Sequence, residues 1–128
     1  MVQVLLICLA GALGTLVRYV VGLWAARAFG TGFPYGTMMV NLTGSFLISI
    51  ILELAISTSA IGPTLRLTLT TGFMGGLTTY SSFNHETLKY FDERAWGMGA
   101  LNMMVTAIGC LIAGALGLHL GRKIAGFG

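Results

Sequence analysis

The residues best suited to chemistry lie in one stretch, TTGFMGGLTTYSSFNHE, which spans residues 70–86. It combines three glycines with six threonines and serines and three aromatic residues, although the surrounding chain is apolar. Glycine lowers helix stability by roughly 1 kcal/mol relative to alanine, and hydroxyl groups in apolar surroundings need hydrogen-bond partners. The stretch therefore predicts a helix that is interrupted at residues 72–79, with polar groups around the break. The hydroxyl residues are Thr70, Thr71, Thr78, Thr79, Ser81 and Ser82.

An interrupted helix offers two kinds of contact to an ion. Carbonyl oxygens released at the break are hard ligands that suit a cation such as Na⁺. The N-terminus of the half-helix that follows favours an anion. Close packing of Gly72, Gly75 and Gly76 against another helix is the alternative explanation. The many hydroxyl groups favour the break, because packing alone would not require them.

Three side chains after the break share one face of a helix. Tyr80, Phe83 and Glu86 recur at intervals of three residues. An aromatic ring has a positively polarised edge, so ring edges that point into a pore can contact a small anion. Packing in a core is the alternative for the two aromatic residues, and their position beside the break favours the pore.

Two other segments each carry a thin polar stripe at intervals of four residues. A buried amide without partners costs roughly 2–7 kcal/mol, so these side chains need hydrogen bonds. Bonds between helices would satisfy them, whereas two matched stripes beside a broken helix favour a narrow ion pathway. The stripes contain amides and hydroxyls and no carboxylate, which suits an anion. The first stripe is Thr37, Asn41 and Ser45, and the second is Asn102, Thr106 and Cys110.

Arg18 lies about two-thirds of the way along the first apolar segment. An arginine that faced lipid would cost about 2.5–3.5 kcal/mol on insertion scales. Its charge could line a water-filled vestibule and attract anions, or it could reach the membrane surface while its stem stays in lipid. The sequence leaves both interpretations open.

The elements that must position these residues are membrane helices. The chain is 55% hydrophobic and 9% charged, whereas an ordinary soluble domain is about 25% charged. Apolar runs recur that can cross a hydrocarbon core of about 30 Å. We therefore predict an all-α integral membrane protein, a single domain of four transmembrane helices over residues 1–128, with the third helix broken near the midplane. The expected helices cover 2–26, 37–57, 64–91 (with the break at 72–79) and 97–120.

Basic residues near the ends of these helices indicate almost no preferred orientation. An excess of Lys and Arg on one side normally sets the orientation, and here three lie on each side. Both orientations are expected, which leads to an antiparallel homodimer with its two-fold axis in the membrane plane. An orientation signal of another kind is the alternative. The terminal side has Arg66, Arg122 and Lys123, and the loop side has Arg27, Lys89 and Arg94.

The whole chain resembles the bacterial fluoride channels of the Fluc or CrcB family. The resemblance lies in its length, the four spans, GTMMVNLTGSF at 36–46 and TGFMGGLTTYSSFNHE at 71–86. It implies a dual-topology homodimer in the cell inner membrane, with two antiparallel pores and a structural Na⁺ at the dimer interface. Such a channel passively exports fluoride from the cytoplasm and reduces fluoride toxicity.

The resemblance also implies roles for single residues. Asn41 would be the pore amide of the second helix, and Tyr80 and Phe83 would be the two pore aromatics, with Tyr80 where phenylalanine is usual. Gly75 and Thr78 would offer backbone carbonyls to Na⁺. The other pore candidates are Thr79, Ser82, Asn102, Thr106 and Cys110, whose thiol is a weaker donor than a hydroxyl, and Arg18 and Glu86 are expected in the vestibule.

Two other classes of function compete with the channel. A small multidrug transporter has four spans but uses a carboxylate deep in its first helix, where this sequence has Arg18 and no acid. A structural membrane subunit would conduct nothing, and Asn41→Ala would then affect only stability. An enzyme is not expected, because the sequence shows no nucleophile–base pair and no metal cluster.

Overall fold

The computed structural model describes residues 1–126, which form a helical protein. Within these residues three helices are long and apolar enough to cross a membrane, namely α1, α2 and α6. This confirms the predicted class, an all-helical integral membrane protein. The elements in chain order are α1 (Val2–Phe29), α2 (Tyr35–Ser57), α3 (Pro63–Leu67), the π-helical segment η1 (Thr68–Met74), α4 (Gly75–Leu77), α5 (Tyr80–Asp92) and α6 (Trp96–Ile124).

The long helices extend beyond the predicted bounds. α1 continues past residue 26 to Phe29 and ends at Gly30, whose φ of 81° suits glycine and whose N–H bonds to the Ala26 carbonyl at 3.1 Å. α6 likewise continues past residue 120 to Ile124. Both ends agree with the expected bounds to within the roughly 2–4 residues to which a sequence can place them. They lie later because hydropathy falls before the backbone hydrogen bonding ends.

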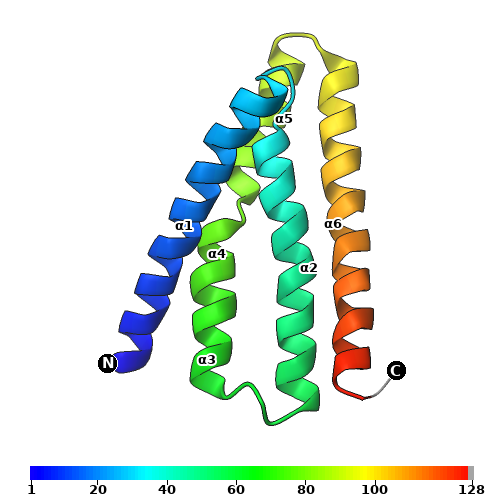
Figure 1. The fold of residues 1–128 in the computed structure, drawn as a ribbon. Helices are drawn as coiled ribbons and strands as arrows, with labels where there is room; N and C mark the ends of the chain where they lie inside the picture. Colours follow the sequence, from blue (N-terminus) through cyan, green and yellow to red (C-terminus); the bar gives the residue numbers. More distant parts are fainter. Residues whose placement is uncertain (127–128) are drawn as a thin grey trace.

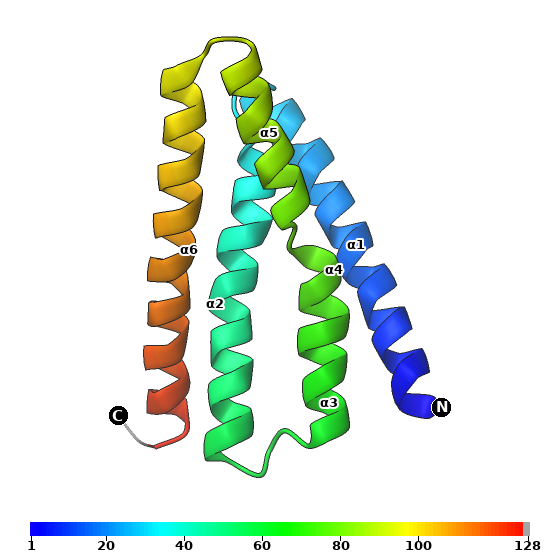
Figure 2. The ribbon, with the colours of Figure 1, turned by 180° about the vertical axis from the view of Figure 1, so that it is seen from behind.

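The helices pack around α2 (Figures 1 and 2). α6 runs along one side of α2, and the segment of α3, η1 and α4 lies between α2 and α1. Both ribbon views place the start of α1 and the end of α6 at one end of the molecule and the α1–α2 and α5–α6 loops at the other. A small core of Val40, Met74 and Leu77 lies between these layers. Large apolar side chains on the outer faces of α1 and α6 are exposed, as suits helices that meet lipid.

Glycines bring the backbones of α1 and the η1–α4 segment into direct contact. A Cβ on Gly76 would overlap the carbonyl oxygen of Gly11, and one on Gly72 would lie 2.9 Å from Ala10 Cβ. Gly14 on α1 meets the same segment, because its Cβ would overlap the Phe73 carbonyl oxygen. Close packing therefore accounts for Gly72 and Gly76, which was the alternative explanation from the sequence.

The chain leaves helical geometry only after these glycines. Gly75 has α-helical angles, with φ −62° and ψ −36°, whereas Thr78 and Thr79 are extended, with ψ of 154° and 113°. The extended stretch is thus Thr78–Thr79 and not the whole of residues 72–79. The extended residues lie at the end of the predicted range, and its first residues belong to the π-helical segment η1. Contacts with α1 offset the intrinsic weakness of glycine in a helix.

Candidate functional site

The extended residue Thr79 is held by the side chain of Asn41. The Asn41 Nδ2 donates to the Thr79 carbonyl at 3.1 Å, and its Oδ1 accepts from the Thr79 N–H at 2.8 Å. Both residues are buried. A backbone group that leaves a helix inside a membrane needs another hydrogen-bond partner. The Asn41 amide on α2 supplies partners for both the N–H and the carbonyl of Thr79.

Thr79 also caps the N-terminus of α5. Its Oγ1 accepts a hydrogen bond from the Ser82 N–H at 3.2 Å and lies 3.1 Å from Ser82 Oγ and 3.2 Å from Ser81 Oγ. A threonine at this position satisfies one of the amide groups that the first turn of a helix leaves unbonded. Three hydroxyl groups are thereby gathered at the positively polarised end of α5.

The predicted aromatic residues follow on α5 and line a cavity between α2 and α6. The ring centroids of Tyr80 and Phe83 are 5.8 Å apart, with an interplanar angle of 59°. The cavity has a volume of about 340 Å³, and we call it the α2–α6 cavity. Six of the predicted pore residues line it, which are Asn41, Thr79, Tyr80, Phe83, Thr106 and Cys110.

A second cavity, of about 280 Å³, contains Arg18. The wall of this Arg18 cavity also includes Ser82 and Thr37, and it shares Thr79 with the α2–α6 cavity. Arg18 is half-buried. The guanidinium-bearing side chain therefore lines a hollow beside the α5 N-terminus.

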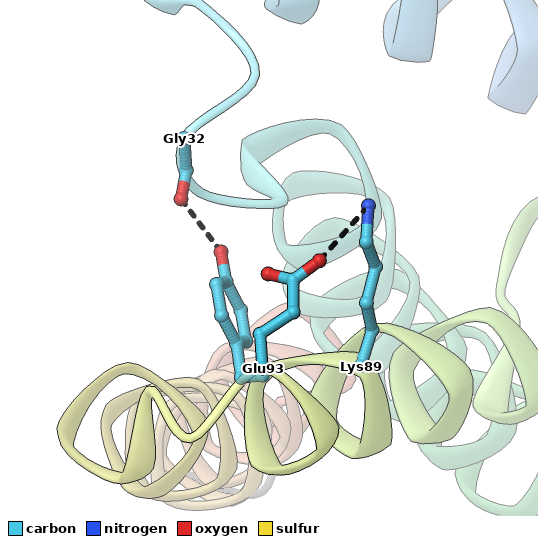
Figure 3. Close-up of polar contacts among 4 residues, drawn as sticks. Gly32, Lys89 and Glu93 are labelled. Carbon is cyan, nitrogen blue, oxygen red and sulfur yellow. Dashed lines mark hydrogen bonds and ion pairs between the residues drawn. The ribbon is translucent and has the colours of Figure 1, made fainter.

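A third cavity, of about 420 Å³, lies between the α1–α2 loop and the end of α5, and we call it the outer cavity. Glu86 lines it and accepts a hydrogen bond at 2.6 Å from Thr37 Oγ1, a residue shared with the Arg18 cavity. At its rim Tyr90 donates to the Gly32 carbonyl at 2.7 Å, and Lys89 pairs with Glu93 at 3.8 Å (Figure 3). Neighbouring cavities thus share wall residues from the α2–α6 cavity outward to this loop.

Asn102, predicted as a pore residue, has a different position from the other candidates. Its side chain is 1% exposed, and its Nδ2 donates to Thr87 Oγ1 at 2.9 Å. Its Oδ1 accepts from Thr106 at 3.4 Å. Asn102 thus faces α5 and is outside the described wall of the α2–α6 cavity. Thr87 was missed in the sequence, although its spacing of four residues from Phe83 is a usable signal.

The backbone around the break bears on the predicted cation ligands. In a continuous helix the Thr79 N–H would bond to the Gly75 carbonyl and the Ser82 N–H to the Thr78 carbonyl. Here these two N–H groups donate instead to Asn41 Oδ1 and Thr79 Oγ1. The carbonyl oxygens of Gly75 and Thr78 are therefore relieved of their helical donors. This donor set fits a hard cation such as Na⁺, which prefers oxygen ligands.

Comparison with known proteins identifies close sequence relatives. The family described as CrcB-like protein, Camphor Resistance (CrcB), matches residues 5–118. A relative from Sorangium cellulosum (strain So ce56), named Fluoride-specific ion channel FluC, is 49% identical over 116 residues that cover 91% of each chain. Relatives of the same name from Anaeromyxobacter sp. (strain K) and Citrifermentans bemidjiense are 46% and 43% identical. They cover 98% and 97% of this chain, and 100% of each relative is matched.

Proposed function

This chain belongs to the CrcB family, and from that premise we propose that it is a fluoride channel of the cell inner membrane. It lets fluoride leave the cytoplasm passively and so reduces fluoride toxicity. The relatives are named as ion channels and not as enzymes. This agrees with the sequence analysis, which did not predict an enzyme. The observation that carries the proposed path is the row of three cavities that share wall residues.

The chemistry of the cavity walls suits a small, strongly hydrated anion. Fluoride must exchange its water for other hydrogen-bond donors before it can pass a narrow site. Asn41 uses one of its two N–H groups on Thr79, so the second remains for an ion. The hydroxyl of Thr106 makes only a long bond to Asn102, at 3.4 Å, and it can rotate toward the cavity.

The aromatic residues extend this set of donors where full charges are absent. The edges of Tyr80 and Phe83 carry partial positive charge, and Cys110 adds a weak S–H donor. Arg18 raises the local anion concentration at the vestibule through its charge. In this proposal the path is too narrow for chloride, and selectivity comes from size together with dense hydrogen-bond donors.

The working unit is an antiparallel homodimer with two pores. Each chain contributes a single domain of four membrane-crossing segments, the third of which is interrupted at Thr78–Thr79. A structural Na⁺ would be held between the two chains by the Gly75 and Thr78 carbonyls of each. The hydrogen-bond exchange at the break supports this assignment, because it makes those oxygens available.

Fluoride efflux from liposomes tests the function directly. Purified protein is reconstituted, and fluoride and chloride efflux are each followed with a selective electrode against protein-free liposomes. We expect rapid loss of fluoride and retention of chloride. Equal leak of both ions would contradict the mechanism. Proton-coupled movement of a cationic drug would favour the multidrug transporter, and absence of flux would favour a structural subunit.

Removal of Na⁺ tests the cation site separately. Protein purified and reconstituted with N-methylglucamine in place of Na⁺ should conduct little fluoride, and restored Na⁺ should recover the flux. Unchanged flux without Na⁺ would contradict the site while leaving the channel itself in place.

A further inference from the structure

A buried chain of hydrogen bonds joins α6 to the backbone of Phe83. Asn102 Nδ2 donates to Thr87 Oγ1 at 2.9 Å, and Thr87 Oγ1 donates to the Phe83 carbonyl at 2.8 Å. Asn102 is 1% exposed and Thr87 is 5% exposed. At that depth water is a poor substitute for either partner, so the geometry of the chain is tightly constrained.

This chain of hydrogen bonds holds the middle of the short helix α5, and the start of that helix is held separately. Asn41 on α2 holds the backbone of Thr79, just before α5. Asn102 on α6 holds Thr87, two helical turns further on. Tyr80 and Phe83 lie between these two attachments. α5 is therefore held by one asparagine from each of the two long helices that form the α2–α6 cavity.

We propose that Asn102 and Thr87 form a positioning pair, which sets the place of the Phe83 ring in the α2–α6 cavity and thereby the discrimination between fluoride and chloride. The inference rests on the proposed function and refines it. Asn102 acts through Thr87 and Phe83, and it does not itself contact the ion. Size selectivity depends on wall positions, and a displacement of about 1 Å can change the rate of a tightly fitted process about 100-fold.

Thr87→Val is the decisive variant, because it keeps the shape of the side chain and removes the hydroxyl that both bonds share. Thr87→Ser keeps the hydroxyl and serves as the rescue variant. Thr68→Val is the matched control, since Thr68 makes the same kind of bond to a carbonyl four residues earlier, at 2.8 Å, on a segment away from the cavity. The fluoride and chloride efflux rates of each variant are measured in liposomes, normalised to folded protein.

We expect Thr87→Val to lower the ratio of fluoride to chloride efflux by about 10-fold. Thr87→Ser and Thr68→Val should retain the wild-type ratio. A general structural defect would reduce the amount of folded protein and leave the ratio of the remaining channels unchanged. A folded Thr87→Val channel with the wild-type ratio overturns the proposal.

The double variant Asn102→Leu with Thr87→Val tests whether Asn102 acts only through Thr87 or is itself a hydrogen-bond donor in the pore. Asn102→Leu alone should lower the ratio as Thr87→Val does, and the two together should lower it no further, since they break one chain. An additional loss of fluoride flux from Asn102→Leu in the Thr87→Val background would show that Asn102 acts on the ion path by a route other than Thr87, either directly or through its bond to Thr106, and it would overturn the proposal.

Failure to fold has a defined outcome as well. Thr87→Ala replaces Thr87→Val if the valine variant does not assemble. If every variant without the hydroxyl fails to fold while Thr68→Val folds, the pair is structural only and the positioning role is overturned. If wild-type protein conducts no fluoride, the proposed function is wrong, and the proposed role of the Asn102–Thr87 pair is wrong as well. A selective wild type with an unaffected Thr87→Val leaves the function intact and overturns the pair alone.

Discussion

The two halves of the segment between Pro63 and Asp92 are held in place by different kinds of contact. The first half, α3 to α4, packs its backbone directly on α1 through glycines at positions 14, 72 and 76. The second half, α5, is held by the side chains of Asn41 and Asn102. One half is thus held by close backbone packing. The other is held by side-chain hydrogen bonds, two from Asn41 just before its start and one from Asn102 near its middle.

The two halves therefore have different roles, since the first supports the fold and the second carries side chains of the proposed ion path. Backbone packing through glycine tolerates little change of any kind, because each added atom meets another backbone. Side-chain hydrogen bonds can be altered one at a time, and the aromatic residues that line the α2–α6 cavity lie on the half that depends on them. Substitutions of the glycines in this backbone contact should therefore prevent assembly of the protein. Substitutions that remove the hydrogen bonds to the second half should change ion flux or selectivity.

Gly14→Ala should have the largest effect. Its Cβ would overlap the Phe73 carbonyl oxygen and lie 2.9 Å from the Leu77 nitrogen, so α1 would have to move away. Overpacking typically costs about 1–3 kcal/mol and occasionally more. Because the backbone cannot rotate away as a side chain can, we expect a cost at the upper end and loss of most assembled protein. Yield of monodisperse protein and thermal unfolding in detergent measure this.

Gly11→Ala is the matched control for that substitution. It lies on the same helix, and its Cβ would be 3.7 Å from the Gly72 carbonyl oxygen, which is an ordinary contact. It should be tolerated. An equal loss from both variants would contradict the account by close approach and indicate a general sensitivity of α1.

Asn41→Leu should have the second largest effect. It leaves the N–H and the carbonyl of Thr79 buried without their partner, and such unsatisfied groups cost about 1–3 kcal/mol each. We expect a clear drop in unfolding temperature and fluoride efflux reduced at least about 10-fold, the rate equivalent of 1.4 kcal/mol. Asn84→Leu, at an exposed position on α5, is the control. A folded Asn41→Leu channel with normal flux would show that the amide is dispensable.

Phe83→Ile should reduce fluoride flux while sparing the fold. Isoleucine keeps an apolar side chain in the wall of the α2–α6 cavity but lacks the polarised ring edge. We expect at least about 10-fold slower efflux, with an unchanged elution volume in size-exclusion chromatography. Tyr80→Phe keeps the ring and should change the flux less. Normal flux through Phe83→Ile would remove the aromatic residues from the mechanism.

Sequence periodicity predicted the wall of the α2–α6 cavity better than it predicted the packing of the first half. An interval of four residues places side chains on one face of a helix whatever surrounds it, so the Asn41 and Thr106 stripes could be recognised before their neighbours were known. Six predicted residues do line one cavity. The position of Asn102 could not be predicted in the same way, because its partner Thr87 lies on a different helix.

The glycines show where prediction from local sequence fails. Helix propensity is a local property, and it placed the interruption at residues 72–79. The packing partners of Gly72 and Gly76 are residues of α1, more than fifty positions earlier in the chain. Such tertiary contacts override propensity, and the extended backbone is confined to Thr78 and Thr79, at the end of that range.

Tyr90→Phe should have the smallest effect. It tests whether the part of α5 at the rim of the outer cavity affects ion selectivity. The substitution removes the hydrogen bond to the Gly32 carbonyl at the rim of the outer cavity. A single bond of this kind contributes about 1 kcal/mol, so we expect a small decrease in unfolding temperature and an unchanged ratio of fluoride to chloride efflux. Lys89→Met, which removes an exposed ion pair at 3.8 Å, should change stability still less. A change in selectivity from Tyr90→Phe would mean that the rim, and not only the two asparagine attachments, sets which ion passes.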